Sequence, residues 1–308
     1  MALPDHLRQL AASVSNAGRW GPDDERGTLN LIDAAAVLRG VAAARTGKVF
    51  SLAIPFDEDG PQTGSIPGRE NPSRTMLAVN TPFLGDPADF CTSDDALSMG
   101  VQAATHWDAL AHVSYEGRLY NNTPADVVDA RGASRLGIDA FGPIVTRGLL
   151  LDVARTHGVD HFDDAHVVDG DDLDAAVAAA GVTVEPGDVV LVRTGHMHFL
   201  RAGDKARFGQ PSPGLGTGSI AWLRDHDVAA VASDTLVLEV WPCEDPAVLL
   251  PVHMIDLVDV GLVQGQLWAL DELAADCAAD GRHEVLLCAT PLPLTRAVGG
   301  PLAPTAVK

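Results

Sequence analysis

The sequence predicts an α/β protein with a mixed β-sheet core and flanking helices. Short aliphatic runs such as residues 189–194 have the length and β-branched content of buried strands, and alanine-rich segments such as residues 171–180 favour helices. The two kinds of segment mix without strict βαβ alternation, which favours a mixed sheet over a purely parallel one. The 308 residues, 46% of them hydrophobic, are enough for a sizeable core and for one large domain or two small ones; of these we predict a single domain over residues 1–308, with an N-terminal helical arm over residues 1–45.

The first third of the chain contains helices, weak strands and long polar loops. Leu7, Leu10 and Ala11 fall on one side of a predicted helix over residues 1–18. Asp33 is expected to cap a second helix that ends near Ala44. The other expected elements are a turn cluster with Trp20 as a packing anchor, a strand over residues 49–54, a loop over 57–74, a strand over 75–79 and a loop over 86–95.

The rest of the chain alternates helices and strands more clearly. Gly181 is expected to end the helix over residues 171–180, and a turn at residues 186–188 leads into the strand over 189–194. His196 and His198 follow this strand, and we interpret them as an exposed or pocket-edge pair because no third ligand is evident. The remaining elements are strands over 147–153, 228–232, 262–268 and 283–290, a helix over 219–225, an apolar stretch over 251–261 and a Pro-rich tail.

Charge and composition exclude several classes of function. The net charge of −21 comes from 42 acidic and 21 basic residues, and such a surface repels nucleic acid and anionic membranes. No run of 18 apolar residues predicts a membrane span, and residues 1–6 lack the features of a signal peptide. The four scattered cysteines contain no Cys-x-x-Cys pair, which favours buried thiols in a reducing cytoplasm over disulfides or a zinc site. We therefore expect a cytoplasmic protein whose partner is neither nucleic acid nor a membrane, whereas the charge says little about its substrate.

Residues 102–112 hold the strongest candidate for a functional site. His106 and Asp108 have the i, i+2 spacing that places two side chains on one face of an extended segment, and Gln102 would lie further back on that face. His112 follows four residues after Asp108. These groups could bind a divalent cation, with one histidine left to move protons. Two histidines and an aspartate also occur together by chance, but the apolar residues around them favour a half-buried site whose polar groups need partners.

The segment Thr105-His106-Trp107-Asp108-Ala109-Leu110-Ala111-His112 resembles the motif of the cyclase-like metal hydrolases, which include bacterial kynurenine formamidases and isatin hydrolases. The usual motif reads His-x-Gly-Thr-His-x-Asp-x-x-x-His. Here Gln102 replaces the first His and Ala104 replaces Gly, a variant similar to relatives of trans-dienelactone hydrolase. The resemblance extends from Trp20 to Pro301 and implies the swivelling β/β/α fold of the kynurenine formamidases.

The resemblance also implies two C-terminal site residues. The family carries a His, often doubled, followed by a Glu or Gln ligand. Here these positions correspond to His253, with Val252 in place of a doubled His, and to Gln266. Because the match needs a small insertion, Gln264 and Asp271 remain alternatives for the second position.

The resulting hypothesis is a metal-dependent hydrolase. Gln102, His106, Asp108 and Gln266 would hold one divalent ion, Mn²⁺ or Zn²⁺, because one carboxylate offers little charge for a second ion. His112 would act as the general base and His253 would assist catalysis on a lactone, a lactam or an N-formyl amide, an arylformamidase-like reaction.

Other classes of function have less support in the sequence. It lacks the Gly-x-Ser-x-Gly elbow of serine hydrolases and a Gly-x-Gly-x-x-Gly loop after a strand. The alternative from another class is a metal-stabilised binding protein without turnover, although His112 would then have no clear role. The resemblance further implies a homodimer or larger homo-oligomer.

Overall fold

A computed structural model describes residues 3–308, and its centre is a nine-stranded mixed sheet. The strand order is β1-β15-β13-β7-β9-β11-β12-β4-β14. The four middle strands run parallel, and the outer strands on both sides pair antiparallel. The strands of this sheet are β1 (Val49–Ser51), β4 (His106–Asp108), β7 (Val145–Asp152), β9 (Val189–Arg193), β11 (Ala230–Ser233), β12 (Val263–Gln266), β13 (Glu284–Cys288), β14 (Gly299–Pro301) and β15 (Thr305–Val307).

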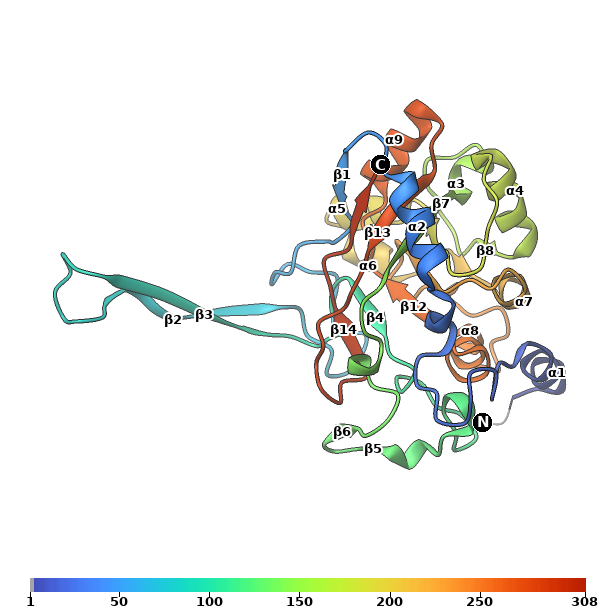
Figure 1. The fold of residues 1–308 in the computed structure, drawn as a ribbon, viewed down its shortest axis with the longest axis horizontal. Coiled ribbons are helices and arrows are strands. Elements are labelled where there is room, and N and C mark those ends of the chain that lie inside the picture. The colour runs from blue at the N-terminus through green and yellow to red at the C-terminus, as the bar shows by residue number, and fades with distance from the viewer. Residues whose placement is uncertain (1–2) are drawn as a thin grey trace.

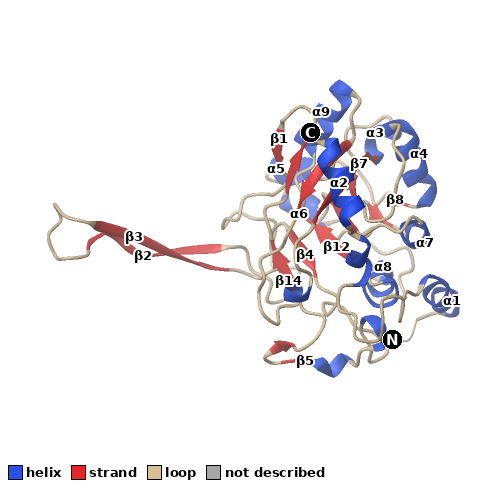
Figure 2. Cartoon of the chain, viewed as in Figure 1, coloured by secondary structure: helices blue, strands red, loops and turns tan. Residues whose placement is uncertain are grey.

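Helices and loops cover both faces of the sheet (Figures 1 and 2). The helices are α1 (Asp5–Val14), α2 (Ala34–Ala43), α3 (Val153–Thr156), α4 (Gly170–Ala180), α5 (Met197–Arg201), α6 (Lys205–Gly209), α7 (Gly218–Asp225), α8 (Pro251–Met254) and α9 (Asp271–Asp280), and a π-helical segment, η5 (Ile255–Val260), continues α8. Among the described residues, no helix is both long and apolar enough to cross a bilayer.

Neighbouring residues of the middle strands point into two different cores. On β9, Val189 and Leu191 join one buried cluster, whereas Val190 and Val192 join the other. The first cluster contains residues of α9, and the second contains residues of α1, α4 and α7. The continuous aliphatic run that predicted this strand is therefore the pattern of a strand buried on both faces.

Several predicted boundaries are confirmed by specific contacts. The Asp33 carboxylate accepts a hydrogen bond from the backbone N–H of Ala36 and caps α2, as expected. Gly181 ends α4 with a φ of 66°, a left-handed conformation that favours glycine. At the other end of α4, Asp169 and Asp172 form a reciprocal capping box. Local sequence therefore determines these helix ends.

Other predictions were wrong in extent or in kind. The first helix covers only Asp5–Val14, and the Pro-rich tail contributes β14 and β15 to the central sheet. The predicted loop over residues 86–95 contains the start of β3 (Cys91–Ser98), which pairs with β2 (Ser73–Pro82). These two strands form a long ribbon that projects away from the rest of the chain, called the arm below (Figure 1). The short pairs β5 (Val128–Asp129) with β6 (Gly132–Ala133) and β8 (Val167–Val168) with β10 (Gly214–Leu215) complete the strands.

The pairing of β4 with β12 builds the floor of the functional site. In this antiparallel register His106 lies opposite Gln266, so their side chains emerge next to each other on one face. Gly265 lies opposite Trp107, and a Cβ atom at Gly265 would approach the rings of Trp107 and Trp268 to 2.6 and 2.7 Å. The missing side chain of Gly265 thus lets the two indoles pack behind the site, with 4.7 Å between their ring centroids.

Candidate metal and active site

A cavity of about 670 Å³ opens over the C-terminal part of β12 and the strand β4. Five of the polar residues singled out in the sequence line it: His106, Asp108, His112, His253 and Gln266. Asp108 is the only carboxylate among the lining residues. Most other lining side chains are apolar, among them Ile66, Val113, Leu236, Val237, Trp241 and Leu250, so the cavity combines a polar floor with an apolar wall.

Asp108 is at the centre of the polar floor. Its Oδ1 atom lies 3.5 Å from Nε2 of His106 and 3.6 Å from Nε2 of His112, and its Oδ2 atom accepts a hydrogen bond of 2.8 Å from Nε2 of Gln266. Burial raises the pKa of the Asp108 carboxyl, but the neighbouring His112 and His106 outweigh burial and hold this pKa well below its usual range. Asp108 is therefore a buried carboxylate that stays charged.

The tautomer of His106 leaves two acceptors facing each other. Nδ1 of His106 lies 2.7 Å from the carbonyl oxygen of Ala104, so this nitrogen carries the proton and donates. In the neutral ring the lone pair of Nε2 then points toward Oδ1 of Asp108. Oδ1 of Asp108 and Oε1 of Gln266 are both enclosed and have no hydrogen-bond partner among the described residues. Buried acceptors of this kind need a proton or a cation between them, and a nitrogen and two oxygens suit a divalent ion.

Gln102 does not lie where the sequence placed it. We expected it on the same extended face as His106 and Asp108, but Gln102 is in a turn that precedes β4. Its Nε2 atom lies 3.4 Å from Nδ1 of His112. The extended prediction failed because the strand covers only His106–Asp108, so the i, i+2 pattern does not continue upstream.

The alternatives to Gln266 are engaged elsewhere. Gln264 donates a hydrogen bond of 3.0 Å to Asp256, away from Asp108. Asp271 begins α9 and forms ion pairs of 2.8 Å with Arg193 and 3.2 Å with Arg201. Neither residue lines the cavity, whereas Gln266 does.

Glu239 belongs to the site but had no signal in the sequence. Its Oε2 atom accepts hydrogen bonds from the backbone N–H of His253 at 2.8 Å and from Nδ1 of His253 at 2.6 Å. Burial lowers the pKa of His253, but the hydrogen bond and charge of Glu239 outweigh it and raise this pKa above its usual value. Burial lowers the pKa of His112, and the partial compensation by Asp108 does not restore it. Of the three histidines that line the cavity, His112 therefore has a lowered pKa and His253 a raised one.

The predicted His-x-His pair after β9 is not part of this site. His196 is fully buried, contrary to the expectation of an exposed or pocket-edge position, and its Nε2 atom lies 3.0 Å from the carbonyl oxygen of Phe208. His198 is exposed and stacks on His161 with 4.3 Å between ring centroids. The pair therefore points into different environments and cannot chelate one ion.

Comparison with known proteins decides the family. The sequence profile described as "Putative cyclase" matches residues 50–240. The chain belongs to the cyclase family. A crystal structure of a novel cyclase shares 35% identity with it, covers 97% of this chain and 99% of its own, and superposes with a TM-score of 0.88. No curated protein matches the chain.

Less similar solved structures share the fold. Isatin hydrolase A from Ralstonia solanacearum is 20% identical, with 88% of this chain and 95% of its own covered and a TM-score of 0.62. A predicted metal-dependent hydrolase from Bacillus stearothermophilus is 18% identical, with 85% and 98% covered and a TM-score of 0.52. These likenesses confirm the mixed α/β fold expected from the sequence, and the family match above confirms the resemblance to the cyclase family.

Proposed function

We propose that this cyclase-family chain is a metal-dependent hydrolase that opens a cyclic or activated amide or ester: a lactone, a lactam or an N-formyl amide. The observation that carries the proposal is the pair of acceptors, Nε2 of His106 and Oδ1 of Asp108, that face each other at 3.5 Å beside the unpartnered Oε1 of Gln266. The names of the isatin hydrolase and metal-dependent hydrolase of similar fold support the same chemistry.

His106, Asp108 and Gln266 would hold one divalent cation, Mn²⁺ or Zn²⁺. Such an ion polarises a carbonyl group and lowers the pKa of water near it. A single ion fits because Asp108 is the only carboxylate among the described residues that line the cavity. We assign Gln102 a different role from the ligand role that the family motif implied, because its carboxamide contacts His112.

His112 would serve as the general base, positioned by Gln102. With the carbonyl oxygen of Gln102 turned toward Nδ1, the ring holds its proton on Nδ1 and Nε2 is free to take a proton from water. The imidazolium that then forms keeps its Nδ1 proton and returns the Nε2 proton to the leaving group. The Gln102 carboxamide lies 3.4 Å from Nδ1, and its carbonyl oxygen can accept from Nδ1–H in both protonation states of the ring, so one orientation of this side chain supports both halves of the proton cycle.

His253 would act as the acid of the pair. Glu239 occupies Nδ1 and raises the pKa of the imidazole, which leaves Nε2 as a proton donor inside the cavity. It would donate to the carbonyl oxygen or leaving group of the substrate. Oppositely shifted pKa values on two histidines of one cavity are the usual division between a base and an acid.

The cavity wall supports a small substrate that carries an apolar ring. Its volume of about 670 Å³ lies within the range of small-molecule sites. Arg69 also lines the cavity. Hydrolysis of any of the proposed bonds creates a carboxylate, which for an N-formyl amide is the released formate, and the Arg69 guanidinium is suited to bind that new charge.

The proposed reaction is tested with a panel of lactones, lactams and N-formyl anilines. We expect turnover of at least one class by protein loaded with Mn²⁺ or Zn²⁺, and loss of that turnover after treatment with a chelator. If the loaded protein binds panel members, as followed by calorimetry, but converts none of them, the alternative of a binding protein without turnover replaces this proposal.

We also propose that the chain forms a homo-oligomer through its arm. The described residues expose thirteen large apolar side chains, and seven lie on the two strands of the arm or on the loop that joins them: Met76, Leu77, Val79, Phe83, Leu84, Phe90 and Leu97. A two-stranded ribbon is marginal by itself in water, so these residues need a cover. A second copy of the chain can provide this cover with the arm alone, because a two-fold axis brings the same apolar patch of two copies into contact.

Negative charge introduced by substitution at the tip of the arm should therefore dissociate the oligomer. Phe83 and Phe90 pack edge to face there, 73% and 65% exposed. We expect the double variant Phe83→Asp, Phe90→Asp to be monomeric in light scattering at micromolar concentration, where the unmodified chain is at least dimeric. Leu38→Asp on α2, 65% exposed, is the matched control and should stay associated. A monomeric unmodified chain would reject the proposal.

A further inference from the structure

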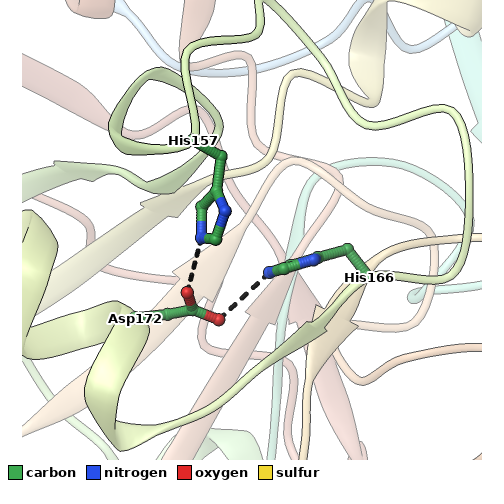
Figure 3. A group of neighbouring side chains, drawn as sticks. All are labelled: His157, His166 and Asp172. Carbon is green, nitrogen blue, oxygen red and sulfur yellow. Dashed lines mark hydrogen bonds and ion pairs between the residues drawn. The ribbon is translucent and has the colours of Figure 1, made fainter.

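A second group of metal-ligating side chains lies outside the cavity, at the start of α4. Nε2 of His157 lies 2.6 Å from Oδ1 of Asp172, and Nε2 of His166 lies 3.0 Å from Oδ2 of the same carboxylate. One ligand atom from each of the three residues lies within 4.8 Å of the other two. Figure 3 shows both imidazoles pointing at the Asp172 carboxylate, one toward each oxygen.

Neighbouring groups hold the three side chains in place. The His166 ring stacks on Phe162 with 4.1 Å between ring centroids, and the His157 ring meets His166 edge-on at 4.6 Å. Asp172 is the third residue of α4, where its carboxylate also contacts the backbone N–H of Asp169 at 3.4 Å. The cluster is therefore organised before any ligand arrives, which lowers the entropic cost of binding.

The three residues come from separate segments. His157 follows the last residue of α3, His166 precedes β8, and Asp172 lies in the first turn of α4. An ion held by all three would tie the end of one helix to the start of the next across the intervening loop.

The surrounding charge attracts cations. Residues 157–174 contain seven aspartates and three histidines and neither lysine nor arginine. The N-terminus of α4 carries a partial positive charge that opposes a cation, but Asp169, Asp171 and Asp172 in or next to its first turn offset it. The side chains of His157 and His166 are 40% and 25% exposed, so an ion can reach them from solvent.

We propose that His157, His166 and Asp172 bind a divalent cation of the Zn²⁺ type, which links the end of α3 to the start of α4 at the protein surface. Two imidazoles and one carboxylate are ordinary zinc ligands, and three protein ligands leave a position for water. When the ion binds, each neutral ring carries its proton on Nδ1 in place of Nε2, so neither ring changes its charge. The competing explanation is a pair of N–H···O hydrogen bonds to Asp172 with no ion. This proposal is independent of the hydrolase proposal.

The test uses Zn²⁺ alone as the probe. The whole chain with Asp108→Asn is stripped of metal and titrated by calorimetry, so that the cavity site is disabled. We expect about one equivalent of Zn²⁺ to bind, with a rise of a few degrees in Tm. His157→Ala and His166→Ala, each added to this background, should lose that equivalent and the rise in Tm. His6→Ala, an exposed histidine on α1, is the matched control and should keep both.

Two outcomes would overturn this proposed metal site. If no Zn²⁺ binds to the Asp108→Asn protein, the cluster is only a pair of hydrogen bonds. If the His157→Ala and His6→Ala variants bind equally, the ion is elsewhere, for example at the exposed thiol of Cys288. Near-ultraviolet absorption of the Co²⁺ form provides a check, because a site of two histidines and a carboxylate lacks the thiolate charge-transfer band. Should either Ala variant fail to fold, His157→Asn and His166→Asn replace them with the same expected loss.

Discussion

Asp108→Asn should abolish both metal binding in the cavity and hydrolysis. The substitution keeps the size of the side chain and removes the only carboxylate that lines the cavity. A unit charge at about 4 Å contributes roughly 4 kcal/mol even at an effective dielectric constant of 20, which corresponds to roughly 10³-fold in affinity. We therefore expect the purified variant to lose its cavity ion, measured as metal content, and to lose measurable turnover of the substrate found in the panel.

Asp256→Asn is the matched control for this change. Asp256 is also fully buried, but it contacts Gln264 and does not line the cavity. Burial raises its pKa to about 7, so a neutral side chain of the same shape is close to its existing state. The control should retain its ion and most of its turnover. Full metal content in Asp108→Asn would show that Asp108 is not a ligand.

His112→Ala should keep the ion and lower turnover by roughly 10²- to 10⁴-fold, the usual contribution of a general base. Nε2 of His112 and Nε2 of His106 both face Oδ1 of Asp108. His112 is the more accessible of these two histidines, with 22% of its side chain exposed, and it lines the cavity. Val113→Ala, which truncates the adjacent cavity wall, controls for local loosening and should change turnover far less. Loss of metal from His112→Ala would instead make His112 a ligand.

The pH dependence of kcat/KM provides a second readout for His112. A base must be unprotonated to act, and burial lowers the pKa of His112 below its ordinary 6.5. Activity should therefore rise with pH along a limb centred below 6.5 and be fully present above it. That limb should vanish in His112→Ala.

Gln102→Met removes the contact with Nδ1 of His112 and should keep the metal while lowering turnover by about 10- to 100-fold. Metal loss in that variant would restore Gln102 as a ligand.

The parts of the structure that local chemistry controls were predictable from the sequence. Asp33 caps α2 through its own side chain, Gly181 ends α4 because it adopts a positive φ, and the aliphatic run of β9 marks a strand buried on both faces. The proximity of His106 and Asp108 was predictable for the same reason, because residues two apart on a strand point to the same face. The family resemblance added His253 and Gln266, and the fold places both in the cavity with that pair.

The parts that depend on distant pairing were not predictable. β14 pairs with β4 across nearly 200 residues, and its Gly-Gly-Pro sequence has no strand pattern of its own. The arm is exposed on both faces, so its strands lack the alternation that marks a half-buried sheet. Glu239 reaches His253 only because the segment after β11 folds back under α8. In each case the tertiary fold determines which segments pair, and the local sequence contains no signal for the pairing.

Reactivation of metal-free protein is the most direct test of a single catalytic ion held by His106, Asp108 and Gln266. The His157→Ala chain is used, so that the surface cluster takes up no ion. It is stripped of metal and titrated with Mn²⁺ or Zn²⁺ while turnover of the panel substrate is followed. We predict no turnover at the start, a linear rise, and a plateau at about one equivalent. Full turnover by the metal-free protein, or a plateau only at two equivalents, would contradict the account.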